Sequence, residues 1–193
     1  MFNNAPPAMI YDISLRAIGL AVGIGLLVAH AVALAMPDKV SAWLKVFPRS
    51  RPAGLFLCSF AAVWAFWLAA TMDLGEFSPQ RVLICGVILA GAIMVPMFAE
   101  EFLAVRALGI LALLAAEPLL GAAFLRPEQS RLVLVVLAYL WATAGLVMVG
   151  APYLLRDAID WLTAARWRYM VVAASGALYG LALIALSLLF YGA

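Results

Sequence analysis

Apolar stretches long enough to cross a lipid bilayer occur six times in this chain of 193 residues. Only 11% of the residues are charged, against about 25% in ordinary soluble domains. The stretches are continuous rather than alternating, which argues against a transmembrane β-barrel. We therefore expect an all-α fold, a polytopic transmembrane helix bundle that forms one domain over residues 1–193 within a lipid bilayer. The expected spans are residues 13–36, 52–72, 82–98, 102–125, 132–155 and 169–191.

The third and fourth spans are separated only by a short acidic break at Glu100 and Glu101. One uninterrupted helix over both spans would be about 66 Å long, about twice the thickness of the hydrocarbon layer. We therefore predict a turn near residues 96–101. The nearby Arg106 completes a charged cluster, which we interpret as a solvated turn rather than a metal site.

The segments between successive spans carry unequal numbers of basic residues. Eight of the twelve Lys and Arg residues fall on the side of segments 37–51 and 153–168, and four fall on the other. Because cytoplasmic loops are enriched in Lys and Arg, this bias predicts that both segments are cytoplasmic and that both termini lie outside the cytoplasm. The net charge of only +2 argues against a nucleic-acid partner.

Segments 37–51 and 153–168 share a pattern: a proline ends a span, an amphipathic stretch contains Trp-Leu, and basic residues precede the next span. We expect both segments to lie in the membrane interface. They are either lids that anchor the fold or docking surfaces, for a partner protein or a second copy. The candidate docking residues are Trp43, Lys45, Arg49, Arg51, Arg156, Asp157, Asp160, Trp161, Arg166 and Arg168.

A second similarity joins the starts of the first and fourth spans, at residues 16–20 and 106–110. The two starts would lie on opposite membrane faces, as in an inverted repeat. The two amphipathic segments lie on the same face and do not fit that plan. An ancient duplication and the limited residue repertoire of membrane helices both remain open as explanations.

Glu117 and His30 are the acidic and basic side chains that lie deep inside the expected spans. Glu117 lies eleven residues after Arg106, about 16 Å along a helix and near the middle of the bilayer, next to Pro118, which we expect to kink the helix. Its carboxyl group is either a proton or cation site or a hydrogen-bonding group between helices. His30 lies in the first span, at a depth that we expect to differ by about 6–7 Å. We hypothesise that His30 and Glu117 form a buried polar pair.

The chain lacks the usual catalytic and nucleotide-binding motifs, and its longest loop is too short for a soluble catalytic domain. We therefore expect no enzymatic activity, no cofactor and no metal site. The first functional hypothesis is a structural or accessory component of a membrane assembly. The alternative is a small proton-coupled transporter or channel that uses Glu117 and His30.

Residues 131–191 contain a set of proline, charged, tryptophan and glycine residues: Pro152, Arg156, Asp157, Trp161, Arg166, Trp167, Arg168, Gly176 and Gly180. With these residues the segment resembles small multi-span bacterial inner-membrane proteins of unassigned function. The resemblance covers about a third of the chain and implies a bacterial inner (cytoplasmic) membrane as its location. It implies no activity, cofactor or site residue.

Overall fold

The computed structural model describes residue 11, residues 13–98 and residues 101–191. In these residues the chain is helical without strands, and six of its helices are long and apolar enough to cross a membrane. Two short 3-10 helices, η1 (Phe47–Arg49) and η2 (Gly75–Gln80), join helical segments. The α-helices are α1 (Leu15–Ala35), α2 (Pro37–Val46), α3 (Arg51–Thr71), α4 (Arg81–Phe98), α5 (Leu103–Ala123), α6 (Arg131–Gly150), α7 (Tyr153–Thr163) and α8 (Arg166–Leu189).

Six long apolar helices lie where the six spans were predicted, with small differences at their ends. The third and fourth spans are separate helices, since α4 ends at Phe98 and α5 begins at Leu103. The fifth span is shorter than predicted, because α6 ends at Gly150 rather than near residue 155. Pro152 has no amide hydrogen with which to continue the helix, and the chain turns there into α7.

Local sequence signals explain where several helices begin. The Ser14 hydroxyl accepts a hydrogen bond of 3.2 Å from the Ala17 amide at the start of α1, and Ser50 caps α3 in the same way. Pro37 stands in the first turn of α2, where its missing amide hydrogen costs nothing. Pro37 thus marks the position at which the chain enters α2, and Ser50 marks the position at which it turns into α3.

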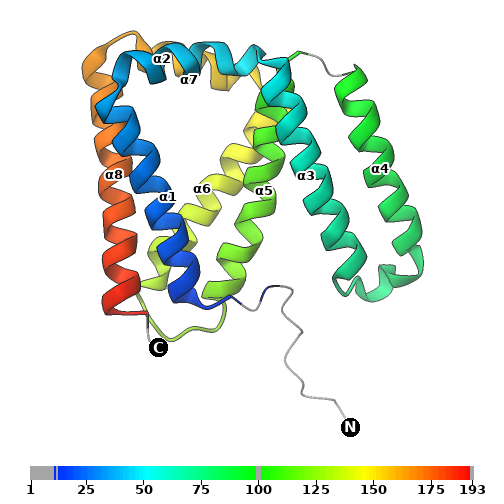
Figure 1. Cartoon of the computed structure of the whole chain (residues 1–193). Helices are drawn as coiled ribbons and strands as arrows, with labels where there is room; N and C mark the ends of the chain where they lie inside the picture. Colours follow the sequence, from blue (N-terminus) through cyan, green and yellow to red (C-terminus); the bar gives the residue numbers. More distant parts are fainter. Residues whose placement is uncertain (1–10, 12, 99–100, 192–193) are drawn as a thin grey trace.

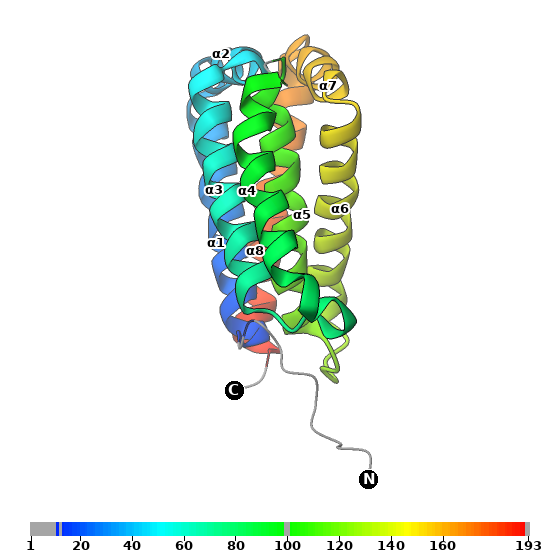
Figure 2. The ribbon, with the colours of Figure 1, turned by 90° about the vertical axis from the view of Figure 1, so that its right-hand side faces the viewer.

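The helices form two groups that meet at one end (Figure 1). In the first group α1 packs along α8; in the second α5 packs along α6 and against α3, with α4 outermost against α3. Helices α2 and α7 run across the bundle at one end, and α1 begins and α8 ends at the opposite end (Figure 1). Figure 2 shows α3, α4, α5 and α6 in front of α1 and α8, with α2 and α7 still at the same end.

The two groups share a core at the end opposite α2 and α7. Leu15 and Ile18 of α1 join Leu119 of α5, Leu134 of α6 and Leu183 of α8 in one cluster of buried side chains. Leu134 and Leu183 are completely buried. Toward α2 and α7 the helices α1 and α5 diverge (Figure 1), so the two groups lie closest together at the end where α1 begins.

Within each group, two glycines bring the helix backbones close together. A Cβ atom added at Gly23 of α1 would lie 3.0 Å from the Gly180 carbonyl oxygen of α8, and one at Gly109 of α5 would lie 2.8 Å from the Gly145 carbonyl oxygen of α6. Such approaches increase van der Waals contact, which drives helix association in a bilayer. A Cβ atom added at Gly121 of α5 would instead meet only Glu117, at 3.8 Å.

Arginines at the start of two helices bond to the end of the preceding helix. The Arg81 guanidinium donates to the carbonyl oxygens of Ala70 and Met72 at the end of α3. The Arg131 guanidinium donates to the Ala123 carbonyl oxygen at the end of α5, at 2.8 Å. Each arginine thus satisfies carbonyl groups that a helix leaves without partners and places positive charge near the negative end of its dipole.

Tyrosines of the C-terminal segment connect neighbouring elements. The Tyr179 hydroxyl donates to the Val133 carbonyl oxygen of α6 at 2.6 Å, and the Tyr169 hydroxyl donates to the Ala33 carbonyl oxygen of α1 at 3.2 Å. The Tyr191 hydroxyl donates to the Ser130 carbonyl oxygen at 3.0 Å. These bonds connect α8 and the residues after it to both groups.

We expect Tyr179→Phe to lower the stability of the protein by about 1 kcal/mol, because it leaves the Val133 carbonyl without this donor. For a chain of this size the apparent Tm in detergent should fall by about 2–4 °C. Tyr139→Phe is the matched control, since the Tyr139 side chain is 61% exposed. Equal shifts in the two variants would contradict this role of Tyr179.

Candidate functional site

Glu117 lies in the second half of α5, six residues before the helix ends at Ala123. This places it about 6 Å from the middle of the helix, well inside the length needed to cross the hydrocarbon layer. Pro118 follows it and is buried, and the helix continues through both residues from Leu103 to Ala123. A proline in a helix interior leaves the carbonyl four residues earlier, at Leu114, without its usual donor.

The Glu117 side chain lies on an exposed face of α5. Among the described residues it has no hydrogen-bond partner and no ion-pair partner. Ala115, two residues earlier, lines a cavity between α3, α5 and α6, and residues two apart on a helix point to nearly opposite sides. Glu117 therefore points away from that cavity.

His30 lies in the half of α1 nearer to α2. Its Nδ1 donates to the Leu26 carbonyl oxygen one turn earlier, at 2.8 Å. Its ring occupies the space left by Gly176 of α8, where an added Cβ would collide with the imidazole. His30 is thus a helix-packing residue with an intrahelical hydrogen bond.

The hypothesised direct pair between His30 and Glu117 is not formed among the described residues. Glu117 lies about 9 Å from the end of α5, whereas His30 lies about 22 Å from the start of α1 at that same end of the bundle. The depth difference is therefore about 13 Å, larger than predicted. In addition, α1 contributes Leu15 and Ile18, at its start, to the core shared with α5. His30 lies farther along α1, toward α2, and is not part of that core.

Helices α2 and α7 correspond to the two amphipathic segments, and they contact each other. In α7 Ile159 is buried, whereas Leu154 is 44% exposed. Trp43 and Trp161 are both exposed, and the Trp43 ring packs on Phe47 at 5.1 Å. The Lys45 side chain is exposed on α2, Arg51 begins α3, and Arg166 begins α8.

Arginines near α7 pair with aromatic rings and with one carboxylate. The Arg168 guanidinium lies 4.7 Å from the centre of the Trp161 ring and 5.6 Å from that of Trp167. Arg156 forms an ion pair of 2.7 Å with Asp157. Asp160 forms no ion pair within the described part of the chain.

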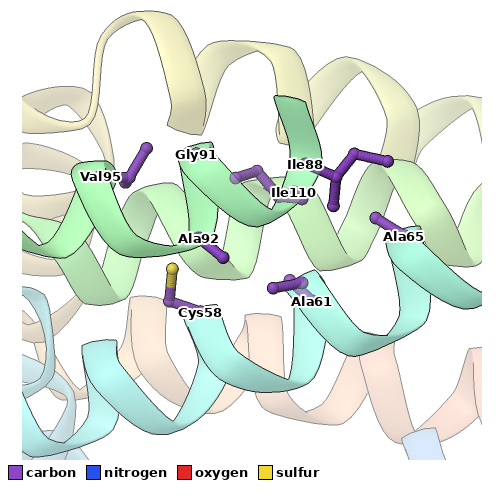
Figure 3. A pocket seen from close by; sticks show the side chains of 9 residues that line it. Cys58, Ala61, Ala65, Ile88, Gly91, Ala92, Val95 and Ile110 are labelled. Atoms are coloured by element: carbon purple, nitrogen blue, oxygen red, sulfur yellow. The ribbon is translucent and has the colours of Figure 1, made fainter. Parts of the chain in front are cut away.

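Several cavities are lined by apolar side chains. Cys58 and Ala61 of α3, Gly91 of α4 and Ile110 of α5 lie around a cavity of about 190 Å³, and Figure 3 shows the Cys58 sulfur directed toward α4. A second cavity of about 370 Å³ lies between α3, α5 and α6. A third, of about 270 Å³, is lined by residues of α1, α2, α7 and α8, including His30.

A further cavity of about 420 Å³ is lined by Arg49, Glu101, Phe102 and Arg156. The sequence placed Glu101 in a cluster with Arg106, but the two form no ion pair among the described residues. Glu100, the third member of that cluster, lies outside the described residues. The meeting of Glu101 with Arg49 and Arg156 depends on how α2, α5 and α7 pack, and no local sequence pattern signals it.

Comparison of the chain with protein-family models, with curated proteins and with solved structures found no match.

Proposed function

We propose that this protein is a non-enzymatic accessory component of a membrane assembly, and that the Glu117 face of α5 binds a transmembrane helix of a partner protein. The observation that carries the proposal is the exposed Glu117 carboxyl group, which has no partner among the described residues. A carboxyl group facing hydrocarbon is costly. A hydrogen-bonding side chain of a neighbouring helix at the same depth would remove that cost.

The surroundings of Glu117 leave room for such a helix. Gly121 lies one turn after Glu117 on the same face, and a Cβ atom there would meet no atom closer than 3.8 Å. Phe124 and Leu125, which follow the end of α5, are also exposed. A partner helix packed along the face of Glu117 and Gly121 would cover the carboxyl group.

We further propose that the protein resides in a bacterial inner membrane, with α2 and α7 on the cytoplasmic side and both termini outside. The excess of Lys and Arg around α2 and α7 supports this orientation. Three of the four basic residues counted on the opposite side are Arg81, Arg126 and Arg131. Arg81 and Arg131 donate to carbonyl oxygens at the ends of α3 and α5. Their presence on that side is therefore explained by helix capping and does not depend on the orientation in the membrane.

The paired helices α2 and α7 form a second contact surface in this proposal. It includes the exposed Trp43, Lys45 and Trp161, and the Arg168 side chain that contacts the Trp161 and Trp167 rings. Exposed tryptophans and basic groups suit the headgroup layer and also an acidic segment of the partner. This surface orients the protein at the membrane while the Glu117 face provides the contact within the bilayer.

The proposal is tested by purifying the full-length protein from its native membrane in a mild detergent and identifying the proteins that elute with it. We expect one membrane protein to co-purify at a constant ratio to this chain. Recovery of the chain by itself, or only as an oligomer of itself, would contradict the proposal.

A proton-coupled transporter that uses Glu117 and His30 is the alternative function. It requires a polar path that connects the two side chains. None of the cavities described above is lined by Glu117, and His30 packs against Gly176. We therefore favour the accessory component.

A further inference from the structure

The cavity lined by Arg49, Glu101, Phe102 and Arg156 lies at the end of the bundle that carries α2 and α7. Arg49 ends η1, Glu101 and Phe102 immediately precede α5, and Arg156 lies in the first turn of α7. Three chain segments that are distant in the sequence therefore place two cations and one carboxylate around a single space.

The charged groups around this cavity retain unused hydrogen-bonding capacity. Arg49 and Glu101 have no ion-pair or hydrogen-bond partner among the described residues, although they carry opposite charges and line the same cavity. The Arg156 Nε and Nη2 atoms both donate to Asp157, at 2.9 Å and 2.7 Å, which leaves its Nη1 hydrogens for another acceptor. The Arg156 guanidinium is also held 5.9 Å from the centre of the Phe102 ring.

An apolar cavity lies along the same part of the bundle. It is lined by Phe60 and Trp64 of α3, by Leu108, Leu111, Ala112 and Ala115 of α5, and by Trp141, Ala144 and Met148 of α6. Each segment that lines the charged cavity is joined in the chain to a helix that lines the apolar cavity. Helix η1 leads into α3, residues 101–102 lead into α5, and α7 follows α6. The charged cavity is thus at the membrane-surface end of the same three helices.

From this arrangement we infer that the α3, α5 and α6 group binds one phosphatidylethanolamine molecule. Arg49 and Arg156 bind its phosphate, Glu101 accepts hydrogen bonds from its primary ammonium group, and an acyl chain lies in the apolar cavity. Arginine suits phosphate oxygens, and a carboxylate suits a donating ammonium group. A trimethylammonium headgroup cannot donate to Glu101, and a glycerol headgroup carries no positive charge, so the lining favours a headgroup with both charges.

The test uses the full-length protein in detergent, stripped of native lipid, and native mass spectrometry. Phosphatidylethanolamine, phosphatidylglycerol and phosphatidylcholine with identical acyl chains are added separately at equal concentrations. We expect phosphatidylethanolamine to bind about tenfold more tightly than either of the others, the difference expected for one charge-assisted hydrogen-bonded group. The double variant Arg49→Ala/Arg156→Ala should lose this binding by about tenfold or more.

Two further variants separate a specific site from a general effect of charge. Glu101→Gln is isosteric and should abolish the preference for phosphatidylethanolamine over phosphatidylglycerol. Lys39→Ala/Arg126→Ala removes the same number of positive charges from exposed positions outside the cavity lining, and should leave binding unchanged. Equal binding of the three lipids by the wild type, equal losses in the two double variants, or an unchanged preference in Glu101→Gln with an unchanged melting temperature would each overturn the inference.

Discussion

Replacing Gly23 with valine is expected to lower the apparent Tm of the protein in detergent by about 6–12 °C. An added Cβ at this position would lie 2.9 Å from Ile184 Cγ1, 3.0 Å from the Gly180 carbonyl oxygen and 3.1 Å from the Ile184 amide nitrogen. Two of these three atoms belong to the α8 backbone, which cannot rotate away as a side chain can. Separating α1 from α8 should therefore cost about 3 kcal/mol, at the upper end of the usual range for overpacking, and the Tm should fall accordingly.

Gly25→Val is the matched control for this prediction. Gly25 lies two residues later in the same helix, and an added Cβ there would meet no atom within 4 Å. The two variants therefore introduce the same side chain into the same helix and differ in the contact with α8. We expect Gly25→Val to shift the Tm by less than about 3 °C, as for substitutions outside packed contacts. Similar losses in both variants would show that the α1–α8 contact is not as described.

Replacing Glu117 with leucine is expected to reduce recovery of the co-purifying partner by about tenfold. The variant removes the hydrogen-bonding group of the proposed contact, and such bonds between transmembrane helices contribute about 1–2 kcal/mol. The stability of the chain itself should not fall, because Glu117 is exposed and has no partner among the described residues. The expected signature is therefore loss of association with an unchanged or slightly higher Tm.

Glu117→Gln is the conservative control, since an amide has the same shape and still forms hydrogen bonds. We expect it to retain most of the partner. A transporter that needs a titrating carboxyl group would instead be inactivated by Glu117→Gln as well as by Glu117→Leu, with proton flux in liposomes as the measurement. Full partner recovery with Glu117→Leu would contradict the proposed contact.

The number of spans and most of their limits followed from the sequence because each depends on a local property, the length of an apolar run and the residues that end it. The main error, at residues 150–155, has the same local character. The apolar run continues past Pro152, but the backbone begins a new helix at Tyr153. Hydropathy does not distinguish the last turn of a span from the first turn of an amphipathic helix.

The helix neighbours did not follow from the sequence. The first span packs with the last, and Gly109 meets Gly145, but neither contact has a signal other than the presence of small residues. The His30–Glu117 hypothesis is incorrect as a direct contact for the same reason. The sequence gives an approximate depth for each side chain, but it does not determine the direction in which each helix face points, which depends on the packing of all the helices together.

The proposed intramembrane contact is tested most directly by site-specific photo-crosslinking in intact native membranes. A photoreactive side chain at position 121 would lie beside Glu117 on the open face of α5, and the same group at position 25 would lie on an open face of α1. We predict a discrete adduct with one other protein from position 121, no such adduct from position 25, and loss of the position-121 adduct when Glu117→Leu is also present. Adducts with lipid alone at position 121, or an adduct with twice the 20.6 kDa mass of this chain, would contradict it.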